Sequence, residues 1–382
     1  MRIAIDGRNL GTAEGTGVAT YATVLLQACQ REGVRTDVVT ATGTSTKVTR
    51  LLRAAQPTRR LYSCGSDLVS PDLFRVAQVH FNLYRRPLPL RLHGHALPAI
   101  MHWTYPLPLH LRGVPNVVTI HDLIPLRQPE LTGIASVRMR RLLAAVIAQA
   151  AVVVTVSETV RHEVIAEFGT APERVVNLSQ AIDLPAALLR DARTVTPLCP
   201  PGSFLVFGTV ERRKNIGRLI QAHAESGVTR PLVILGPDGD GAAAELAPAT
   251  RHPLGRTAVQ RIVWSNRPAL IRAIAEAHAV LFPSLAEGFG LPILEAMALG
   301  TPVMTSRGGA TEEIAGGAAL LIDPLSVRDM ANGIAALDRE ADLPHQLRAA
   351  GLQRGKVFSL DAYAKRLRTL YETVGSLTRV TV

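Results

Sequence analysis

Short runs of hydrophobic residues rich in valine and isoleucine recur along the chain, and a longer stretch with helical spacing follows each of them. Runs of about four to six such residues are typical of buried strands, and their alternation with helices predicts parallel sheets. The pattern occupies both halves of the chain, so it predicts an α/β protein with two Rossmann-like, doubly wound domains. Clear examples of the predicted strands are residues 2–5, 117–120, 152–156, 204–209, 232–235, 279–283 and 302–305.

The periodic pattern is interrupted between residues 182 and 202, where four prolines occur without a clear hydrophobic period. Such a segment is typical of a hinge between domains, and we place the boundary near residue 195. The predicted domains are therefore residues 1–195 and 196–360. Residues 361–382 begin with an amphipathic helix, and we expect it to return to the first domain, covering it with one apolar side. That side carries Tyr363, Leu367, Leu370 and Tyr371.

Helix signals support this interpretation of the second half. Pro292 stands where a first helical turn begins, and Gly300 follows the last periodic residue of the same helix. Ser326 and Asp329 have the spacing of a helix start before the apolar positions of residues 330–337.

Composition limits the class of protein. The chain has 382 residues, of which 47% are hydrophobic and 19% charged, which argues against long disordered or repetitive segments. Cys29, Cys64 and Cys199 are too few and too widely spaced for a disulfide framework or a cysteine zinc site. The first residues lack the pattern of an export signal, and the longest apolar stretch, residues 142–156, is short for a membrane span. These features predict a cytoplasmic protein.

Positive charge is concentrated in the first half. The net charge is +11, and residues 1–190 hold 21 Lys and Arg against 13 Asp and Glu, whereas the remainder holds 21 against 18. An anionic neighbour is expected for the first domain: phospholipid, polyprenyl phosphate or nucleic acid. Arg138 and Arg141 share one face of a predicted helix that could rest on an anionic membrane surface. Interleaved aromatic residues are missing, which argues against nucleic acid.

Residues 281–296 combine a buried strand, a loop with one carboxylate and a helix with a second carboxylate. Gly288 and Gly290 allow a ligand to approach the loop closely, and the amino end of the helix offers backbone donors. Glu287 and Glu295 are spaced to accept hydrogen bonds from separate hydroxyl groups of one elongated ligand. Taken singly, each acid could instead be an ordinary solvated side chain.

This stretch resembles the Glu-x7-Glu motif of the retaining nucleotide-sugar glycosyltransferases of family 4, which have the GT-B fold. The resemblance covers nearly the whole chain and implies two domains that face each other across a cleft. It further implies that Glu287 binds hydroxyls of the donor sugar and that Glu295 binds the nucleotide ribose. The amides around Phe289, Gly290 and Leu291 would contact the sugar and the diphosphate.

A second motif follows the first strand of the second domain. Gly208 ends the strand, and Arg213 and Lys214 place two cations beside a predicted helix start at Asn215, an arrangement suited to a diphosphate. The motif resembles the family's glycine and Arg-Lys-Asn pattern, which makes Lys214, one of four lysines, the stabiliser of the leaving group. Thr209 stands where some relatives have arginine, so either Arg213 or another cation completes the pair.

The first domain offers two further candidates. Gly15 and Gly17 lie in a loop that precedes a helix and resembles the family loop that closes over the donor diphosphate, although the full dinucleotide glycine pattern is absent. His121 ends a strand and resembles the family histidine that touches the donor sugar near its reacting carbon. Asp122 either orients His121 or caps the next turn. Residues 102–106 either line an acceptor pocket or, for Trp103, belong to the core.

Residues 238–240 have the Asp-x-Asp sequence of a metal site found in another glycosyltransferase fold. They follow a predicted strand of the second domain, where such a site does not occur, so we interpret them as a solvated loop. We expect no metal and no cofactor beyond the nucleotide sugar itself.

The resemblance implies a retaining hexosyltransferase of the bacterial mannosyltransferase type, with GDP-mannose as the favoured donor. UDP-glucose and dTDP-rhamnose are the alternative donors. The implied acceptor is a saccharide, on a polyprenyl diphosphate, in surface or exopolysaccharide synthesis at the inner face of the cell membrane. Alternatives from other classes are a basic Rossmann-type nucleic-acid-binding protein and a nicotinamide-dependent enzyme.

Overall fold

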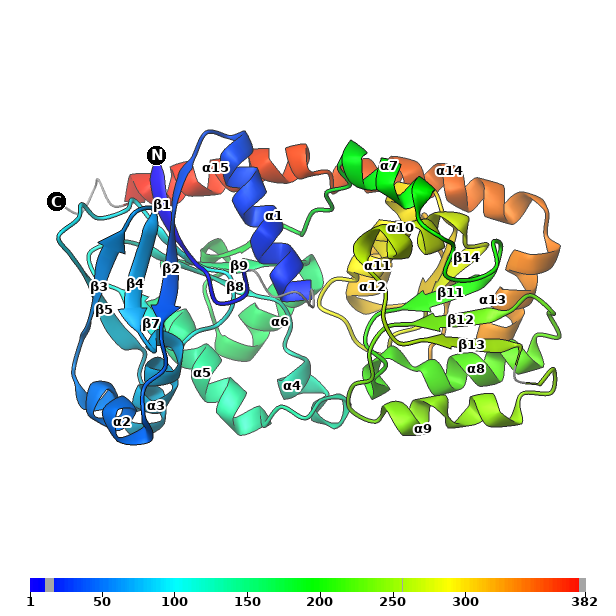
Figure 1. The fold of residues 1–382 in the computed structure, drawn as a ribbon, viewed down its shortest axis with the longest axis horizontal. Helices are drawn as coiled ribbons and strands as arrows, with labels where there is room; N and C mark the ends of the chain where they lie inside the picture. The colour runs from blue at the N-terminus through cyan, green and yellow to red at the C-terminus, as the bar shows by residue number, and fades with distance from the viewer. Residues whose placement is uncertain (11–16, 256, 378–382) are drawn as a thin grey trace. The chain divides into compact units, whose positions relative to one another are not determined.

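The computed structural model describes residues 1–10, 17–255 and 257–377, and these residues form two compact units (Figure 1). The first unit contains residues 1–127, 134–181 and 360–382, and the second contains residues 128–133 and 182–359. Each unit is built around one sheet. The two-domain α/β architecture expected from the hydrophobic pattern is thereby confirmed.

The sheet of the first unit has ten strands in the order β10-β9-β8-β6-β1-β2-β4-β3-β5-β7. Neighbouring strands are parallel except for β3 and β4, which pair antiparallel. The strands are β1 (Arg2–Asp6), β2 (Arg35–Thr42), β3 (Arg59–Cys64), β4 (Asp67–Pro71), β5 (Leu88–His93), β6 (Met101–Trp103), β7 (Leu109–Leu111), β8 (Asn116–Ile120), β9 (Val152–Thr155) and β10 (Val175–Asn177). Helices of this unit are α1 (Gly17–Arg31), α2 (Lys47–Ala55), α3 (Leu73–Tyr84), α4 (Ile124–Arg127), α5 (Ser136–Gln149), α6 (Glu158–Phe168) and α15 (Leu360–Leu377).

The sheet of the second unit has six strands, all parallel, in the order β13-β12-β11-β14-β15-β16. The strands are β11 (Phe204–Phe207), β12 (Leu232–Leu235), β13 (Val259–Ile262), β14 (Ala279–Phe282), β15 (Val303–Ser306) and β16 (Leu320–Ile322). Helices of this unit are α7 (Ala186–Thr194), α8 (Ile216–Glu225), α9 (Ala242–Leu246), α10 (Arg267–Glu276), α11 (Leu291–Leu299), α12 (Gly309–Ala315), α13 (Val327–Arg339) and α14 (Asp342–Val357). Parallel strands buried on both faces explain why their sequences are continuous hydrophobic runs rather than alternating ones.

Helix ends in the second unit follow the predicted local signals. α11 has Pro292 in its first turn and ends at Gly300, whose φ of 74° is the left-handed conformation of a glycine cap. The side chain of Ser326 accepts a hydrogen bond from the Asp329 amide at the start of α13. Of these two helices, α13 packs around a core with β11, β12 and β14 that includes Phe204, Ile334 and Leu337, and α11 packs on β14 and β15.

The chain passes from the first unit to the second between residues 181 and 182, earlier than the predicted boundary at 195. The reason is α7, which packs against α10 of the second unit. Arg272 of α10 donates hydrogen bonds to the carbonyls of Arg193 and Val195, at 3.3 and 2.5 Å. The proline-rich segment therefore belongs to the second unit, because its helix is bonded there.

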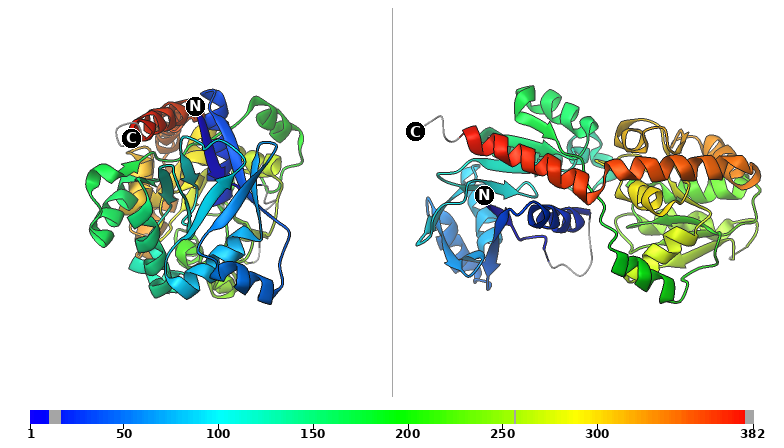
Figure 2. Two further views of the ribbon diagram at one scale, coloured as in Figure 1. Left: turned by 90° about the vertical axis from the view of Figure 1, so that its left-hand side faces the viewer. Right: turned by 90° about the horizontal axis from the view of Figure 1, so that it is seen from above.

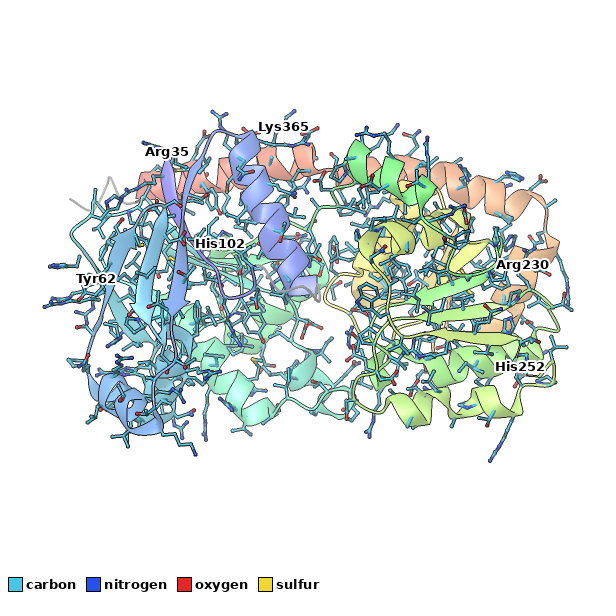
Figure 3. All side chains as sticks on the ribbon, in the orientation of Figure 1. Arg35, Tyr62, His102, Arg230, His252 and Lys365 are labelled. Atoms are coloured by element: carbon cyan, nitrogen blue, oxygen red, sulfur yellow. The ribbon has the colours of Figure 1, made fainter. Side chains whose placement is uncertain are left out.

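Helix α15 lies in the first unit beside α1, as the views of Figure 2 show. The four residues that the sequence placed on its apolar side are all buried, with exposed fractions of 5% or less. The hydroxyl of Tyr371 lies 2.7 Å from Nδ1 of His102, and the hydroxyl of Thr119 lies 2.8 Å from Nε2 of the same ring. His102 is fully buried within the first unit (Figure 3), so this polar contact joins α15 to strands β6 and β8.

Helices long and apolar enough to cross a membrane are not found in the part of the chain that the structure describes.

Gly236, directly after β12, is the described glycine at which a side chain has least room. Its φ is 140°, and a Cβ atom there would lie 2.1 Å from the carbonyl oxygen of Gly208. We expect Gly236→Ala to lower the free energy of unfolding by about 3 kcal/mol or more, because the backbone must shift at both strand ends. Gly317→Ala is the matched control, since Gly317 also has positive φ but open space around it, and about 1 kcal/mol is expected. Chemical denaturation measures both; equal losses would contradict the steric argument.

Acid should weaken the fold through His102. Burial lowers the pKa of His102 to about 3, from the 6.5 of a free histidine. Between these values the unfolded chain binds the proton and the folded chain does not, so the free energy of unfolding falls as pH decreases. At about pH 4.5, the contribution of His102 to the free energy of unfolding is about 2–3 kcal/mol smaller than at pH 7. Burial raises the pKa of Asp6 to about 6, which acts in the opposite sense.

The contribution of His102 is isolated by comparing the acid slope of the native chain with that of His102→Gln, which should be shallower. His345→Gln, at an exposed position of α14, should leave the slope unchanged. Titration of the His102 ring by NMR gives an independent check: protonation near pH 6 in the folded chain would refute the explanation.

Candidate functional site

Two loops of the second unit lie side by side at the carboxyl ends of adjacent parallel strands. The first follows β11 and contains Gly208 and a short 3₁₀ turn, Arg212–Lys214. The second follows β14 and contains Glu287. The amide of Leu285 donates to the carbonyl of Arg213 at 2.8 Å, so the two loop backbones are bonded directly. The carboxyl edge of a parallel sheet is where ligands of such folds bind.

Asn215 links the first loop to helix α8. It has a φ of 61°, a left-handed conformation that asparagine tolerates better than most residues. Its side-chain amide donates to the carbonyls of Pro283 and Pro324, at 3.1 and 2.7 Å. The helix start predicted at Asn215 is confirmed, since Asn215 is the residue before α8.

Lys214, Arg213 and Glu287 form a buried ion cluster. Lys214 Nζ donates to Oε1 of Glu287 at 2.6 Å, and Arg213 Nη1 lies 2.5 Å from Oε2 of the same carboxylate. The side chains of Lys214 and Glu287 are each 10% exposed, and the Lys214 ammonium lies 4.4 Å from the centre of the Phe282 ring. Burial alone would raise the pKa of Glu287, but Lys214 and Arg213 outweigh it and lower that pKa to about 2. The carboxylate is therefore ionised at neutral pH.

The donors of Arg213 are largely engaged within the protein. Besides Glu287, its guanidinium bonds to Oε1 of Glu211 at 2.5 Å and to the carbonyl of Ala286 at 3.3 Å. Lys214 uses one N–H bond for Glu287, and an ammonium group has three. Lys214 therefore keeps donors for a ligand, while most donors of Arg213 are engaged within the protein.

The amino end of α11 supplies backbone donors next to this cluster. Gly290 precedes the helix with a φ of 111°, a conformation open to glycine, and it turns the chain into the helix. The amides of Phe289, Gly290 and Leu291 have no hydrogen-bond partner among the described residues. By contrast, the start of α8 is already occupied, because the Gly217 amide donates to the Glu245 carboxylate at 2.8 Å. Of the two helix starts, α11 is therefore the one that can receive an anion or a hydroxyl-rich ligand.

Glu295 lies one turn into α11 and is 8% exposed. Its Oε1 lies 2.5 Å from Nη2 of Arg267, the first residue of α10, whose side chain is 40% exposed. Glu295 is thus neither a solvated surface acid nor part of the Lys214 cluster; it forms a second, separate ion pair on the same loop-helix element.

His121 occupies the equivalent edge of the first sheet, after β8. Its ring lies 4.9 Å from Tyr21, edge to face, and 6.3 Å from Tyr105, nearly parallel. Nε2 lies 2.8 Å from the carbonyl of Thr104, and because a carbonyl only accepts, this nitrogen carries the proton. Burial lowers the pKa of His121 to about 4, with the Thr104 bond opposing. The ring is therefore neutral at pH 7, and Nδ1 is left as a hydrogen-bond acceptor.

The neighbours of His121 have distinct roles. Asp122 caps the next turn, since its Oδ1 accepts from the Ile124 amide at 3.1 Å. Trp103 is a core residue, 2% exposed, with Nε1 donating to Asn116. The guanidinium of Arg8 lies 5.7 Å from the centre of the Tyr105 ring. Tyr105 and Arg8 therefore provide an aromatic face and a cation near the histidine.

The glycine pair of the first-domain loop is only partly described. Gly17 is the first residue of α1 and is exposed, whereas Gly15 lies outside the described residues.

The Asp-Gly-Asp sequence forms an exposed loop after β12. The side chain of Asp238 is 58% exposed and pairs with Arg261 at 2.6 Å. Within residues 1–10, 17–255 and 257–377, no group of His, Cys, Asp or Glu is arranged to hold a metal ion.

Three partners of the site escaped the sequence analysis. Glu211 and Arg267 complete the two ion pairs, and Glu245 occupies the start of α8. Glu211 lies between Gly208 and Arg213 in the sequence, so its contact with Arg213 had a local signal. Arg267 and Glu245 are separated from their partners by 28 residues each, and single-sequence spacing carries no signal for such contacts.

Comparison with known proteins covers both halves of the chain. Residues 15–185 match the family described as Glycosyltransferase Family 4, and residues 200–354 match the family described as Glycosyl transferases group 1.

Curated relatives are about 30% identical. An O-antigen chain mannosyltransferase B of Escherichia coli is 31% identical over 257 residues, which are 64% of this chain and 66% of that protein. A D-inositol 3-phosphate glycosyltransferase of Catenulispora acidiphila is 30% identical over 282 residues, which are 69% of this chain and 67% of that protein. The chain spans between about half and two thirds of the length of the first curated relatives it matches.

Among solved structures, a sucrose-phosphate synthase of Thermosynechococcus elongatus has a TM-score of 0.73. At 18% identity, covering 99% of this chain and 100% of the other, it shows that the fold is shared. Two α/β units with mainly parallel sheets, the strand-loop-helix motifs and the matches to both halves lead to one conclusion: the chain belongs to the group 1, family 4 type of GT-B glycosyltransferases.

Proposed function

We propose that this chain is a retaining glycosyltransferase that moves a hexose, with mannose favoured, from a nucleotide diphosphate sugar to a saccharide acceptor. The observation that carries the proposal is the Lys214–Glu287 ion pair beside the amides that begin α11, which have no hydrogen-bond partner among the described residues. The two loops thus carry a cation and backbone amides that suit a diphosphate, and a carboxylate that suits sugar hydroxyls. These are the groups needed to bind both parts of a nucleotide sugar.

Each group has a place in donor binding. Lys214 and the amides of residues 289–291 hold the diphosphate, and Glu287 accepts hydrogen bonds from sugar hydroxyls. Glu295 accepts from the ribose, with Arg267 holding its carboxylate in position. Arg213 holds Glu287 and Lys214 in position, since most of its own donors are engaged within the protein.

In the reaction, the bond between the anomeric carbon and the diphosphate oxygen breaks, and an acceptor hydroxyl forms the new bond on the same face of the sugar. The hydroxyl proton passes to the departing phosphate. Lys214 and the helix amides stabilise the negative charge that develops on that phosphate. Same-face substitution is favoured because no carboxylate of the second-unit site is free of a cationic partner and available as a nucleophile in the described chain.

This assignment requires neither a metal nor a further cofactor. The charge that a divalent cation would neutralise is met by Lys214 and the amide dipoles at the start of α11. Within the first unit, the neutral ring of His121 offers Nδ1 as an acceptor for a sugar hydroxyl.

Mannose is favoured because the Escherichia coli relative is a mannosyltransferase; UDP-glucose and dTDP-rhamnose remain the alternative donors. The same relative acts on O-antigen chains by name, which supports a saccharide acceptor in surface or exopolysaccharide synthesis. A polyprenyl diphosphate on that acceptor, and a site of action at the inner face of the cell membrane, suit the basic first unit.

Donor identity can be tested by thermal unfolding with GDP-mannose, UDP-glucose, dTDP-rhamnose and NAD. We expect GDP-mannose to raise Tm most and NAD to leave it unchanged, because at equal concentration a ligand that binds the folded state more tightly stabilises it more. In Glu287→Gln, the shift with GDP-mannose should fall to that with GDP, since the sugar loses its ionised acceptor. Salt-sensitive nucleic-acid binding without any response to nucleotide sugars would instead support the nucleic-acid alternative.

The role of Lys214 can be tested by turnover of the best donor in EDTA. We expect Lys214→Met, which keeps most of the side-chain volume, to reduce turnover by about 100-fold or more, because the leaving group loses its cation. Lys356→Met is the matched control, since Lys356 is exposed on α14 and bonds only locally, to Gln353. Full turnover by a folded Lys214→Met protein would exclude the assigned role, and loss of native turnover in EDTA would exclude metal independence.

A further inference from the structure

Helices α2, α3 and α5 of the first unit are basic and contain no acidic residue. They lie together along the lower edge of that unit in Figure 1, where α2 packs on α3. Their cations, with the two arginines that directly follow α3, are Lys47, Arg50, Arg53, Arg75, Arg85, Arg86, Arg138, Arg140 and Arg141. Much of the excess positive charge of the chain is therefore gathered on three helices, which we call the α2–α3–α5 surface.

Few of these cations are neutralised. Arg50 pairs with the buried Asp72 at 2.7 Å, and Arg140 pairs with Glu167. For the side chains of Lys47, Arg53, Arg75, Arg85, Arg138 and Arg141, the described residues supply no ion pair or hydrogen bond. The α2–α3–α5 surface therefore carries mainly positive charge that is not balanced by salt bridges.

Helix α2 turns an apolar stripe towards solvent. Val48, Leu51 and Leu52 are 69%, 51% and 67% exposed, and with Ala55 they repeat at the spacing of one helix face. The other side of α2 packs on α3. Ala54 is fully buried there, and its carbonyl accepts a hydrogen bond from Nδ1 of His80 at 2.7 Å. A helix normally buries its apolar stripe in the core, so this orientation leaves the stripe available for another apolar medium.

The apolar exposure continues on the neighbouring helices. Leu83 and Tyr84 at the end of α3 are 50% and 44% exposed, and Val137 in α5 is 62% exposed. Between α3 and α5 lies a hollow of about 290 Å³ with Phe81 in its wall and three arginines around it. The arginines are Arg85, Arg138 and Arg141. Cations around an apolar hollow match a molecule with a phosphate head and a hydrocarbon body.

We propose that the α2–α3–α5 surface binds an anionic phospholipid bilayer, with the stripe of α2 inserted among the acyl chains and lipid phosphates at the arginines around the hollow. An amphipathic basic helix with exposed leucines is suited to the boundary between head groups and acyl chains. Nucleic acid would match the charge but leave the apolar stripe in water. An acidic protein partner would match both features, and it is an outcome that the experiment separates.

The full-length chain is tested by co-sedimentation with vesicles of phosphatidylcholine and phosphatidylglycerol, at about three to one, and with pure phosphatidylcholine. We expect binding to the mixed vesicles, weakened by salt, and at least about tenfold weaker binding to the neutral ones. Leu51→Asp with Leu52→Asp should lower the affinity for mixed vesicles by about tenfold or more. Arg138→Glu with Arg141→Glu should do the same.

Matched controls come from the second unit. Trp264 and Leu325 are 69% and 67% exposed, and their double replacement by aspartate should leave vesicle binding unchanged. Arg190→Glu with Arg251→Glu repeats the charge reversal at two exposed arginines of that unit. Circular dichroism confirms that each variant is folded.

Three results would overturn the proposal: equal binding to neutral vesicles, equal loss in the control variants, or a dimer or protein complex that depends on Leu51 and Leu52 while vesicles are not bound. The surface is defined without reference to the reaction, and the assay contains no sugar nucleotide. The Tm shift with GDP-mannose, measured on the same variants, should be unchanged, so failure of one proposal is distinguishable from failure of the other.

Discussion

The second unit depends on a pair of opposite charges taken out of water. Lys214 and Glu287 are 73 residues apart in the chain, yet their charged atoms meet at 2.6 Å with little exposure. A buried charge is tolerated when it is paired and hydrogen-bonded, so each of these side chains fixes the position of the other. The pairing holds together the loops after β11 and β14, and the bond between Leu285 and Arg213 reinforces it through the backbone. Everything proposed for the donor site follows from this arrangement.

The same constraint supports the proposed binding of an anionic donor at this site. Arg213 engages Glu211 and Glu287, so the two cations and two carboxylates have no net formal charge. A neutral cluster does not repel a sugar, and in the proposed function the attraction for phosphate comes from the spare donors of Lys214 and from the α11 amides. Burial disfavours the charged form of Glu287 and of His121 alike. At Glu287 the neighbouring Lys214 and Arg213 outweigh burial and keep the carboxylate ionised, whereas at His121 burial prevails and leaves a neutral acceptor.

The charges on the surface of the first unit are arranged differently from the paired charges of the second-unit site. Acidic residues are absent from α2, α3 and α5, and most of their cations project into solvent beside exposed leucine, valine and tyrosine side chains. The asymmetry between the two halves of the sequence is thereby localised to one surface. A site of fixed, paired charges and a surface of unpaired charges are suited to different ligands: a small anion held in a defined geometry, and an extended anionic layer.

The sequence by itself determined the local features: buried strands as apolar runs, the start and end of α11 from proline and glycine, the cap at Ser326, and the two loops that carry Lys214 and Glu287. These depend on interactions between residues a few positions apart, so their signals are contained in short windows. Tertiary structure alone decided the antiparallel placement of β3, the assignment of α7 to the second unit, the need for glycine at Gly236, and the pairing of Glu295 with Arg267. Those features are set by contacts between segments distant in the chain, whose energies depend on how whole elements pack.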